Sequence, residues 1–253
     1  MGKKKSNYNR VIIFTLLIVS AIAITFYYLK FYDKNYFIKY GEFGIHIPTN
    51  YAIHGIDVSR HQKRISWKDV EKMNVDGIRF HFAFIKATEG VESVDEHFKK
   101  NWKNIRKTKL YAGAYHFFIA TKSGKAQAVN FIKTVHLTAG DLPPVLDVEE
   151  HYGVKSIDIV KRVKDWLFLV ERAYGVKPII YTNVDFYKKY LKGNFDEYPL
   201  WIAHYHQQVQ PRIEREWLFW QHSDVGQVDG INTYVDFNVF SGDSMQLQQL
   251  LIP

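Results

Sequence analysis

Two acidic residues lie two positions apart near the middle of the chain, in the segment LPPVLDVEE that covers residues 142–150. Two prolines and a short apolar run precede Asp147 and Glu149, which is typical of a buried parallel strand rather than a helix. Residues i and i+2 of a strand face the same way, so we expect the two carboxyl groups to be close together. Their repulsion should raise at least one pKa. Acid-catalysed cleavage of a glycosidic bond requires a carboxyl group with a raised pKa beside one with an ordinary pKa.

A D-x-E pair alone has a plainer interpretation, in which the acids end a loop or bind a lysine, because perturbed carboxyl groups mark functional sites only statistically. Polar residues, however, stand at the far end of nearly every apolar run. They are Asp57, Lys86, Glu89, Tyr115, His116, Asp147, Glu149, Tyr181, Asn183, Trp201, His204, Tyr205, Gln221, His222, Asp236 and Asn238. Each can also be a satisfied polar group within a barrel layer. In a closed barrel the first and eighth strands are neighbours, so we expect Asp57 and Asp236 to lie side by side.

The order of the apolar runs predicts an α/β fold, an irregular TIM-like barrel of about eight strands and five helices. The expected strands are 53–58, 82–87, 111–117, 144–149, 178–182, 200–205, 218–222 and 234–238, and the expected helices are 66–73, 94–107, 125–137, 157–174 and 184–191. Ser66 is the expected N-cap of the first helix. The closing strands leave no room for helices, which indicates a hairpin near the end. In such barrels catalytic residues gather at the carboxyl ends of the strands.

The first 29 residues predict a membrane anchor. Residues 1–10 are basic, and residues 11–29 contain no charge. This uncharged segment is long enough to cross a hydrocarbon core of about 30 Å. The positive flank favours an N-terminus inside and the rest of the chain outside the cytoplasmic membrane. A cleaved signal peptide is the alternative, because Ala21, Ile22 and Ala23 resemble a cleavage site, but the apolar run continues to Leu29. We assign residues 30–49 to a stalk and 50–253 to the catalytic barrel.

Composition narrows the possible functions. The absence of cysteine excludes disulfides, thiolate metal sites and cysteine nucleophiles. A net charge of +8 without a basic stripe or motif argues against nucleic acid and suits an anionic cell wall or membrane face. The pair His204 and His206 lacks the further ligands that zinc needs, so we expect neither a metal nor a cofactor. We also expect a monomer. The aromatic content of 16% fits either a large barrel core or sugar binding.

Motifs across residues 53–240 resemble glycoside hydrolase family 25, the CH-type lysozymes or N-acetylmuramidases. In chain order they are GIDVS at 55–59 with Gln62, FAFIKATEG at 82–90, GAYHF at 113–117, PPVLDVE at 143–149, IIYT at 179–182, LWIAHY at 200–205, WQHS at 220–223, VDGI at 228–231 and VDFN at 235–238. The resemblance implies an irregular barrel with eight strands and fewer helices. Two departures are His222, where an aromatic residue is usual, and an N-terminal anchor in place of cell-wall-binding repeats.

The resemblance also implies an activity, the hydrolysis with retention of the β-1,4 bond between N-acetylmuramic acid and N-acetylglucosamine in peptidoglycan. Glu149 would be the general acid/base, and Asp57, Asp147 and Asp236 would form the acidic floor. Either Asp147 attacks as a nucleophile, or the 2-acetamido group of the substrate attacks while Asp147 orients it; the short spacing favours the second mechanism. Candidates for positioning substrate are Tyr115, Tyr181, Trp201, Gln221 and Glu89. For Tyr181 and Trp201, packing is an equal alternative.

Two other functions compete with this interpretation. A chitinase-like β-1,4-N-acetylglucosaminidase of family 18 would carry an acid two residues before Asp147, where this chain has Val145. A barrel that binds cell-wall glycan without cutting it would lack one of the four acids, and all four are present. The sequence therefore predicts a membrane-anchored muramidase that acts outside the cytoplasmic membrane on peptidoglycan strands.

Overall fold

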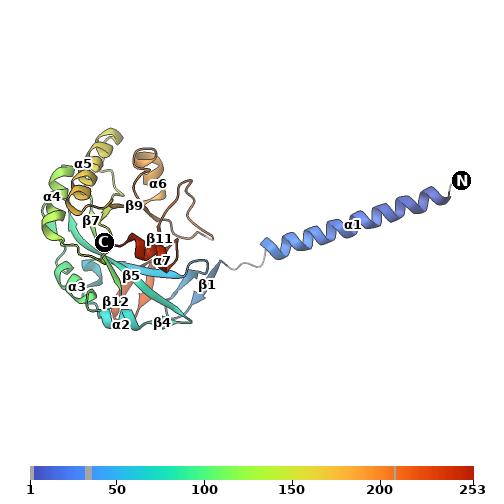
Figure 1. Ribbon diagram of the computed structural model, residues 1–253, viewed down its shortest axis with the longest axis horizontal. Coiled ribbons are helices and arrows are strands. Elements are labelled where there is room, and N and C mark those ends of the chain that lie inside the picture. The colour runs from blue at the N-terminus through green and yellow to red at the C-terminus, as the bar shows by residue number, and fades with distance from the viewer. Residues whose placement is uncertain (1–2, 32–35, 208) are drawn as a thin grey trace. The chain divides into compact units, whose positions relative to one another are not determined.

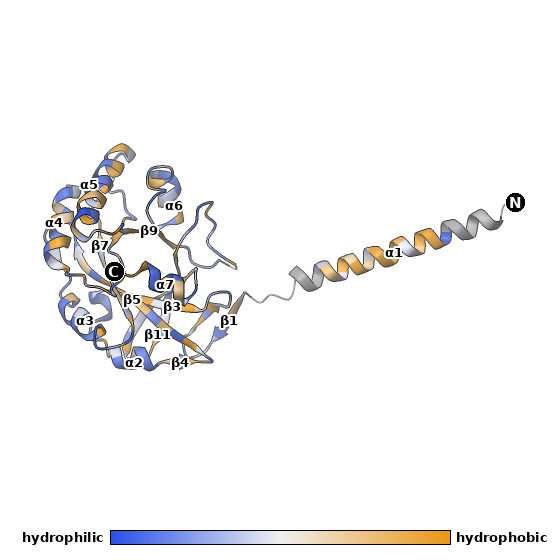
Figure 2. Ribbon diagram, in the orientation of Figure 1, coloured by the Kyte–Doolittle hydropathy of each residue, from blue (hydrophilic) through white to orange (hydrophobic). Residues whose placement is uncertain are grey.

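The computed structural model describes residues 3–31, 36–207 and 209–253, which divide into two compact units, Met1–Tyr36 and Phe37–Pro253 (Figure 1). The first unit contains α1 (Lys3–Phe31), whose 29 residues extend about 43 Å at 1.5 Å per residue. Its apolar side chains between residues 10 and 27 are exposed, and the orange colour of this stretch in Figure 2 marks its hydrophobic residues. By length and composition, Arg10–Tyr27 could cross a membrane.

The second unit contains a barrel with flanking helices. Its strands are β1 (Phe37–Tyr40), β2 (Ile45–Pro48), β3 (Ile53–Val58), β4 (Asn74–Val75), β5 (Ile78–Glu89), β6 (Ser93–Val94), β7 (Tyr111–Phe117), β8 (Val145–Asp147), β9 (Ile179–Asn183), β10 (Leu200–Ala203), β11 (Phe219–Val228) and β12 (Ile231–Phe240). Its helices are α2 (Trp67–Lys72), α3 (Phe98–Ile105), α4 (Gly124–Thr134), α5 (Ser156–Tyr174), α6 (Val184–Phe186) and α7 (Ser244–Leu250), with a 3₁₀ turn at Arg60–Gln62 and a π-helical turn at Tyr187–Leu191. In Figure 1, α2, α3, α4 and α5 form an arc around the outside of the barrel.

Eight strands close the barrel in the order β3-β12-β11-β10-β9-β8-β7-β5, and β5 pairs back to β3. Neighbours from β3 through β5 to β11 run parallel, whereas β12 is antiparallel to both β11 and β3. This confirms the predicted α/β barrel and its closing hairpin. The predicted number of helices was too low, because α7, which follows the last strand, was not among the predicted helices. The capping box of Asp243 and Gln246 marks the start of α7 in the sequence, and Leu247 of this helix packs in the barrel interior.

Several element boundaries differ from expectation. The strand expected at 144–149 ends at Asp147, and the helix expected at 94–107 begins only at Phe98 because Val94 pairs with β5 in β6. Ser66 occupies the N-cap of α2, but its side chain makes no capping hydrogen bond.

A hairpin precedes the barrel in the stretch expected from the sequence to form a stalk. Strands β1 and β2 pair in register from Phe37 to Pro48. Phe43, at the turn, is fully buried and its ring lies 5.4 Å from Phe237, while Phe37 lies 5.9 Å from Trp220. These rings pack on the outer face of β11 and β12, and the described residues between β10 and β12 contain no helix that could cover it. The hairpin therefore belongs to the compact unit that begins at Phe37.

Aromatic rings fill the barrel interior because alternate residues of each strand point inward. Phe84 is fully buried and stacks on Trp201, with ring centroids 4.5 Å apart. Glycines on the adjacent strands leave room for these rings. A Cβ at Gly55 would lie 2.4 Å from the ring of Phe82, and a Cβ at Gly113 would lie 2.3 Å from the ring of Phe84.

We predict that Gly113→Ala destabilises the fold, because the ring of Phe84 cannot move away from Trp201 without breaking the stack. Overpacking of this kind costs about 1–3 kcal/mol. Thermal unfolding of the full chain in detergent should show a lower midpoint than wild type. Gly41→Ala is the matched control, since no atom lies within 4 Å of its added Cβ. Equal midpoints for the two variants would contradict this account of the interior.

Candidate active site

The four predicted acids converge at the carboxyl end of the parallel strands. Asp57 lies near the end of β3 and Asp147 ends β8. Because β12 runs antiparallel, its first half reaches the same end, and Asp236 pairs directly with Asp57. Glu149 lies two residues beyond β8, but the backbone N–H of Val148 still donates to the carbonyl oxygen of Tyr181 at 3.0 Å. This bond extends the link between β8 and β9 to within one residue of Glu149.

Asp57 is the most firmly held of the four acids. Its Oδ2 accepts hydrogen bonds from Gln221 Nε2 at 2.8 Å and from Asn238 Nδ2 at 2.7 Å. Asn238 Oδ1 in turn accepts the indole N–H of Trp201 at 2.8 Å. An indole N–H can only donate, so it fixes the orientation of the Asn238 amide and aims the amide N–H at Asp57.

The other amide is oriented in the same way. Gln221 Oε1 accepts the hydroxyl of Tyr181 at 2.8 Å and that of Tyr205 at 2.6 Å, which leaves Gln221 Nε2 to donate to Asp57. Tyr181, Trp201 and Gln221 therefore support Asp57. Trp201 is only 2% exposed and stacks on Phe84, a position that matches the packing alternative.

Burial raises the pKa of every acid in the cluster. Desolvation raises the pKa of Asp57 to about 6 even though two amides stabilise its charge. Desolvation and the charge of Asp57 raise the pKa of Asp236 to about 9. The pKa of Asp147 is raised by desolvation and by the charge of Glu149, and that of Glu149 by desolvation and by Glu150 and Asp57. The cluster therefore retains protons at neutral pH.

Lys86 is a cation beside these acids. Its charge lowers the pKa of both Asp147 and Glu149, against the larger effect of desolvation. Its Nζ lies 2.6 Å from Glu89 Oε2 and 4.5 Å from the ring centroid of Phe117, and its side chain is 14% exposed. Glu89, a predicted substrate contact, is thus the ion-pair partner that positions Lys86.

Tyr115 lies among the acids. It is 9% exposed, and desolvation together with the charges of Asp57, Asp147 and Asp236 raises the pKa of its phenol well above the usual value. Within the described part of the chain its hydroxyl makes no hydrogen bond. Of the five predicted substrate contacts, Tyr115 therefore has a polar group that remains free for a ligand.

Three supporting residues were outside the predicted site set. Asn238 and Tyr205 were recognised only as polar strand ends, and their hydrogen-bonding roles depend on side-chain direction. Asp95 accepts the backbone N–H groups of Arg60 and His97, at 2.8 and 2.9 Å, and so anchors the turn after β3. Asp95 opens the charged segment DEHFKK (residues 95–100), and nothing in that segment signals a contact with the distant Arg60.

His222, the departure noted in the sequence, lies outside the acid cluster. It is 5% exposed and packs against Phe37, Trp220 and Phe237 on the outer side of β11. Gln221 points inward and His222 outward because neighbouring strand residues face opposite sides.

The arrangement can supply both a proton and a negative charge to a bound molecule. Buried carboxyl groups with raised pKa values are suited to general acid catalysis near neutral pH. Asp57, with two amide donors, is best able to remain ionised. Glu149 is half-buried, whereas Asp147 is 6% exposed, so Glu149 is the more accessible of the D-x-E pair.

We predict that Asp236→Asn stabilises the fold at high pH. An acid whose folded pKa is raised contributes stability at low pH that is lost as the pH rises through the interval from about 4 to about 9. Asparagine carries no charge, so the unfolding midpoint at pH 8 should rise by at least about 3 °C, while at pH 4 it should match wild type. An equal difference at both pH values would contradict this electrostatic origin.

Three comparisons with known proteins agree with this geometry. Residues 56–231 match the model of glycosyl hydrolases family 25. The chain is 31% identical to lysozyme M1 of Streptomyces globisporus over 214 residues, covering 79% of this chain and 71% of the relative. It is 50% identical over 229 residues to protein YegX of Escherichia coli (strain K12), covering 90% of this chain and 83% of the relative. A family 25 glycosyl hydrolase from Bacillus anthracis superposes with a TM-score of 0.75 at 36% identity, covering 81% of this chain and 95% of that one. This chain belongs to glycosyl hydrolase family 25, and it is a glycosidase of the lysozyme type.

Proposed function

We propose that this protein is a muramidase that hydrolyses the β-1,4 bond between N-acetylmuramic acid and N-acetylglucosamine in peptidoglycan. The observation that carries the proposal is the buried acid cluster, in which Glu149 has a raised pKa and lies beside Asp147 at the carboxyl end of a family 25 barrel. Lysozyme M1 and a solved lysozyme from Streptomyces coelicolor, 30% identical to this chain, support this substrate class.

Asp147 and Glu149 would share one proton before substrate binds. Unlike Asp57, the carboxyl group of Asp147 accepts no hydrogen bond from any residue in the described ranges. The N–H of a 2-acetamido group could provide this missing partner. It would favour the ionised form of Asp147, because hydrogen bonds to a carboxylate lower its pKa. The shared proton would then remain on Glu149.

Glu149 would donate that proton to the glycosidic oxygen as the bond to C1 breaks. The carbonyl oxygen of the 2-acetamido group would attack C1 and form an oxazolinium, with Asp147 stabilising the positive charge. Glu149, now ionised, would remove a proton from a water molecule as that water attacks C1. This attack breaks the bond between C1 and the acetamido oxygen and so opens the oxazolinium ring. Two inversions give retention. Direct attack by Asp147, forming a glycosyl ester, is the alternative route to the same stereochemistry.

We also propose that α1 anchors the enzyme in the cytoplasmic membrane, with the N-terminus inside and the barrel outside. The support is the length and composition of Arg10–Tyr27, together with Lys3, Lys4 and Lys5 before it. This orientation gives the barrel access to peptidoglycan. Cleavage after Ala23 would release the barrel instead.

Glu149→Gln tests the assigned acid. The full chain in detergent would be incubated with purified peptidoglycan, and the products reduced with borohydride and analysed by mass spectrometry. Wild type should release fragments that end in reduced muramic acid. Glu149→Gln should slow their release by about 10²–10⁴-fold, the usual contribution of a general acid, while remaining folded.

Glu92→Gln is the matched control, since Glu92 is an exposed carboxylate that does not act on the pKa of Glu149, and it should retain most of the turnover. Near-normal activity of a folded Glu149→Gln would overturn the acid assignment. Wild-type products that end in reduced glucosamine would overturn the bond assignment and favour a glucosaminidase.

A further inference from the structure

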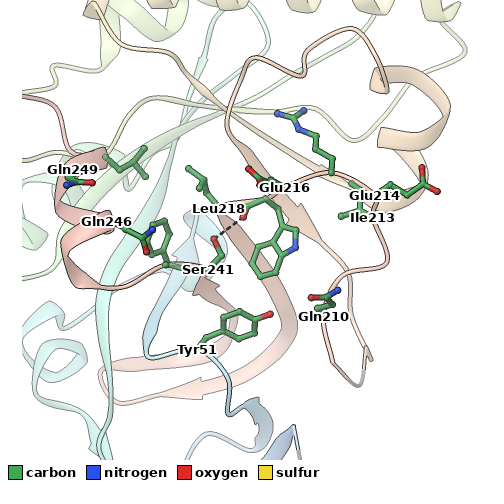
Figure 3. A pocket seen from close by; sticks show the side chains of 14 residues that line it. Tyr51, Gln210, Ile213, Glu214, Glu216, Leu218, Ser241, Gln246 and Gln249 are labelled. Atoms are coloured by element: carbon green, nitrogen blue, oxygen red, sulfur yellow. Dashed lines mark hydrogen bonds between the residues drawn. The ribbon is translucent and has the colours of Figure 1, made fainter. Parts of the chain in front are cut away.

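A cavity of about 930 Å³ lies at the end of the barrel opposite the acids (Figure 3). Tyr51 just before β3, Leu218 just before β11 and Phe240 at the end of the antiparallel β12 line it. These positions are the amino ends of the parallel strands, whereas Asp57 and Asp147 lie toward the carboxyl ends. The cavity is therefore separate from the candidate active site.

Two aromatic rings that line the cavity pack against a third, buried ring. Tyr51 and Trp217 are half-buried, with ring centroids 5.6 Å apart. Both contact Trp220, which is fully buried and donates its indole N–H to the carbonyl oxygen of His204 at 2.9 Å. The rings thus form a preorganised surface of the kind on which the apolar C–H face of a sugar packs, with polar tips available for hydroxyl groups.

Uncharged amides line the rest of the cavity. The side chains of Gln210 and Gln249 make no hydrogen bond to any residue in the described ranges. Gln246 Oε1 accepts the backbone N–H of Asp243 at 2.9 Å, which leaves its amide N–H groups available. Figure 3 shows Gln246 and Gln249 on one side of the cavity and Gln210 on the other. Amides both donate and accept, as sugar hydroxyl and acetamido groups require.

The charged residues of the cavity do not suit an anion. Glu214 pairs with Lys192 at 2.9 Å. Arg215 donates to the backbone carbonyl oxygens of Phe195, Asp196 and Tyr198, so its guanidinium is already used. Glu216 remains as an exposed carboxylate. Glu214 is paired with Lys192, and Arg215 lies 3.8 Å from the carboxylate of Asp196. Among the described residues, Glu216 therefore leaves one unpaired negative charge in the cavity, which would repel a phosphate or a nucleic acid but not a neutral glycan.

We propose that this cavity binds a chain of β-1,4-linked N-acetylhexosamines, as a second glycan site separate from the catalytic end. The choice of this glycan rests on the proposed function. Because the two sites lie at opposite ends of the barrel, the enzyme can hold one strand of an insoluble wall while it cuts another. The cavity should then matter for insoluble peptidoglycan and not for short soluble fragments.

Isothermal titration with N-acetylchitohexaose, a β-1,4-linked hexamer of N-acetylglucosamine, tests the site. The full chain in detergent would carry Glu149→Gln to prevent turnover. Adding Gln210→Ala and Gln249→Ala should weaken one binding event by about tenfold or more, the cost of two lost hydrogen bonds. Gln248→Ala, a neighbouring exposed residue of α7 outside this cavity, is the matched control and should leave the titration unchanged.

With Glu149 intact, the double variant should digest insoluble peptidoglycan more slowly and soluble fragments at the wild-type rate. Trp217→Phe, which preserves the ring packing, should likewise weaken the same binding event. Identical titrations for the parent and the double variant, or no binding by the parent, would overturn the second site. The binding experiment needs no turnover, so a failure of the proposed activity would appear separately, as wild type that binds the glycan but releases no products.

Discussion

The desolvation of four carboxyl groups at one end of the barrel is the constraint on which the site depends. The ionised form of each acid would be more stable in water, and burial raises the pKa of all four. The protein offsets this desolvation cost to a different extent for each acid. Asp57 receives two amide hydrogen bonds, and Lys86 acts on Asp147 and Glu149. This uneven support allows one cluster to hold both a proton and a negative charge.

The barrel interior makes the uneven support possible. Phe84 and Trp201 stack in the middle of the barrel, and the edge of Trp201 reaches Asn238 with its N–H. The same ring thus packs the core and orients an amide of the site. Gly113 is part of this arrangement, because only a residue without a side chain leaves room for the ring of Phe84. Core packing and site geometry cannot be changed independently here.

Much of the fold followed from local pattern. The alternation of apolar runs and helical segments predicted the eight strands and the closing hairpin, and the polar strand ends predicted that Asp57 and Asp236 would meet. Other features depend on side-chain contacts between distant segments. For Trp201, packing was an equal alternative to substrate contact, and for Gln221 substrate positioning stays a prediction; their hydrogen bonds to Asn238 and Asp57 could not be read from the sequence. The hairpin at residues 37–48 was missed because its aromatic residues find their buried surface only on β11 and β12.

Carbon-13 NMR titration of the side-chain carboxyl groups of the full chain tests the central claim most directly, namely that Asp147 and Glu149 share a proton under the influence of Lys86. Both groups should titrate above the ordinary values of about 3.9 and about 4.3, and Asp147→Asn should change the titration of Glu149. Lys86→Met should move both transitions to higher pH, because the lysine lowers both pKa values. A Glu149 that titrates at its ordinary value, and is unaffected by either substitution, would contradict the account.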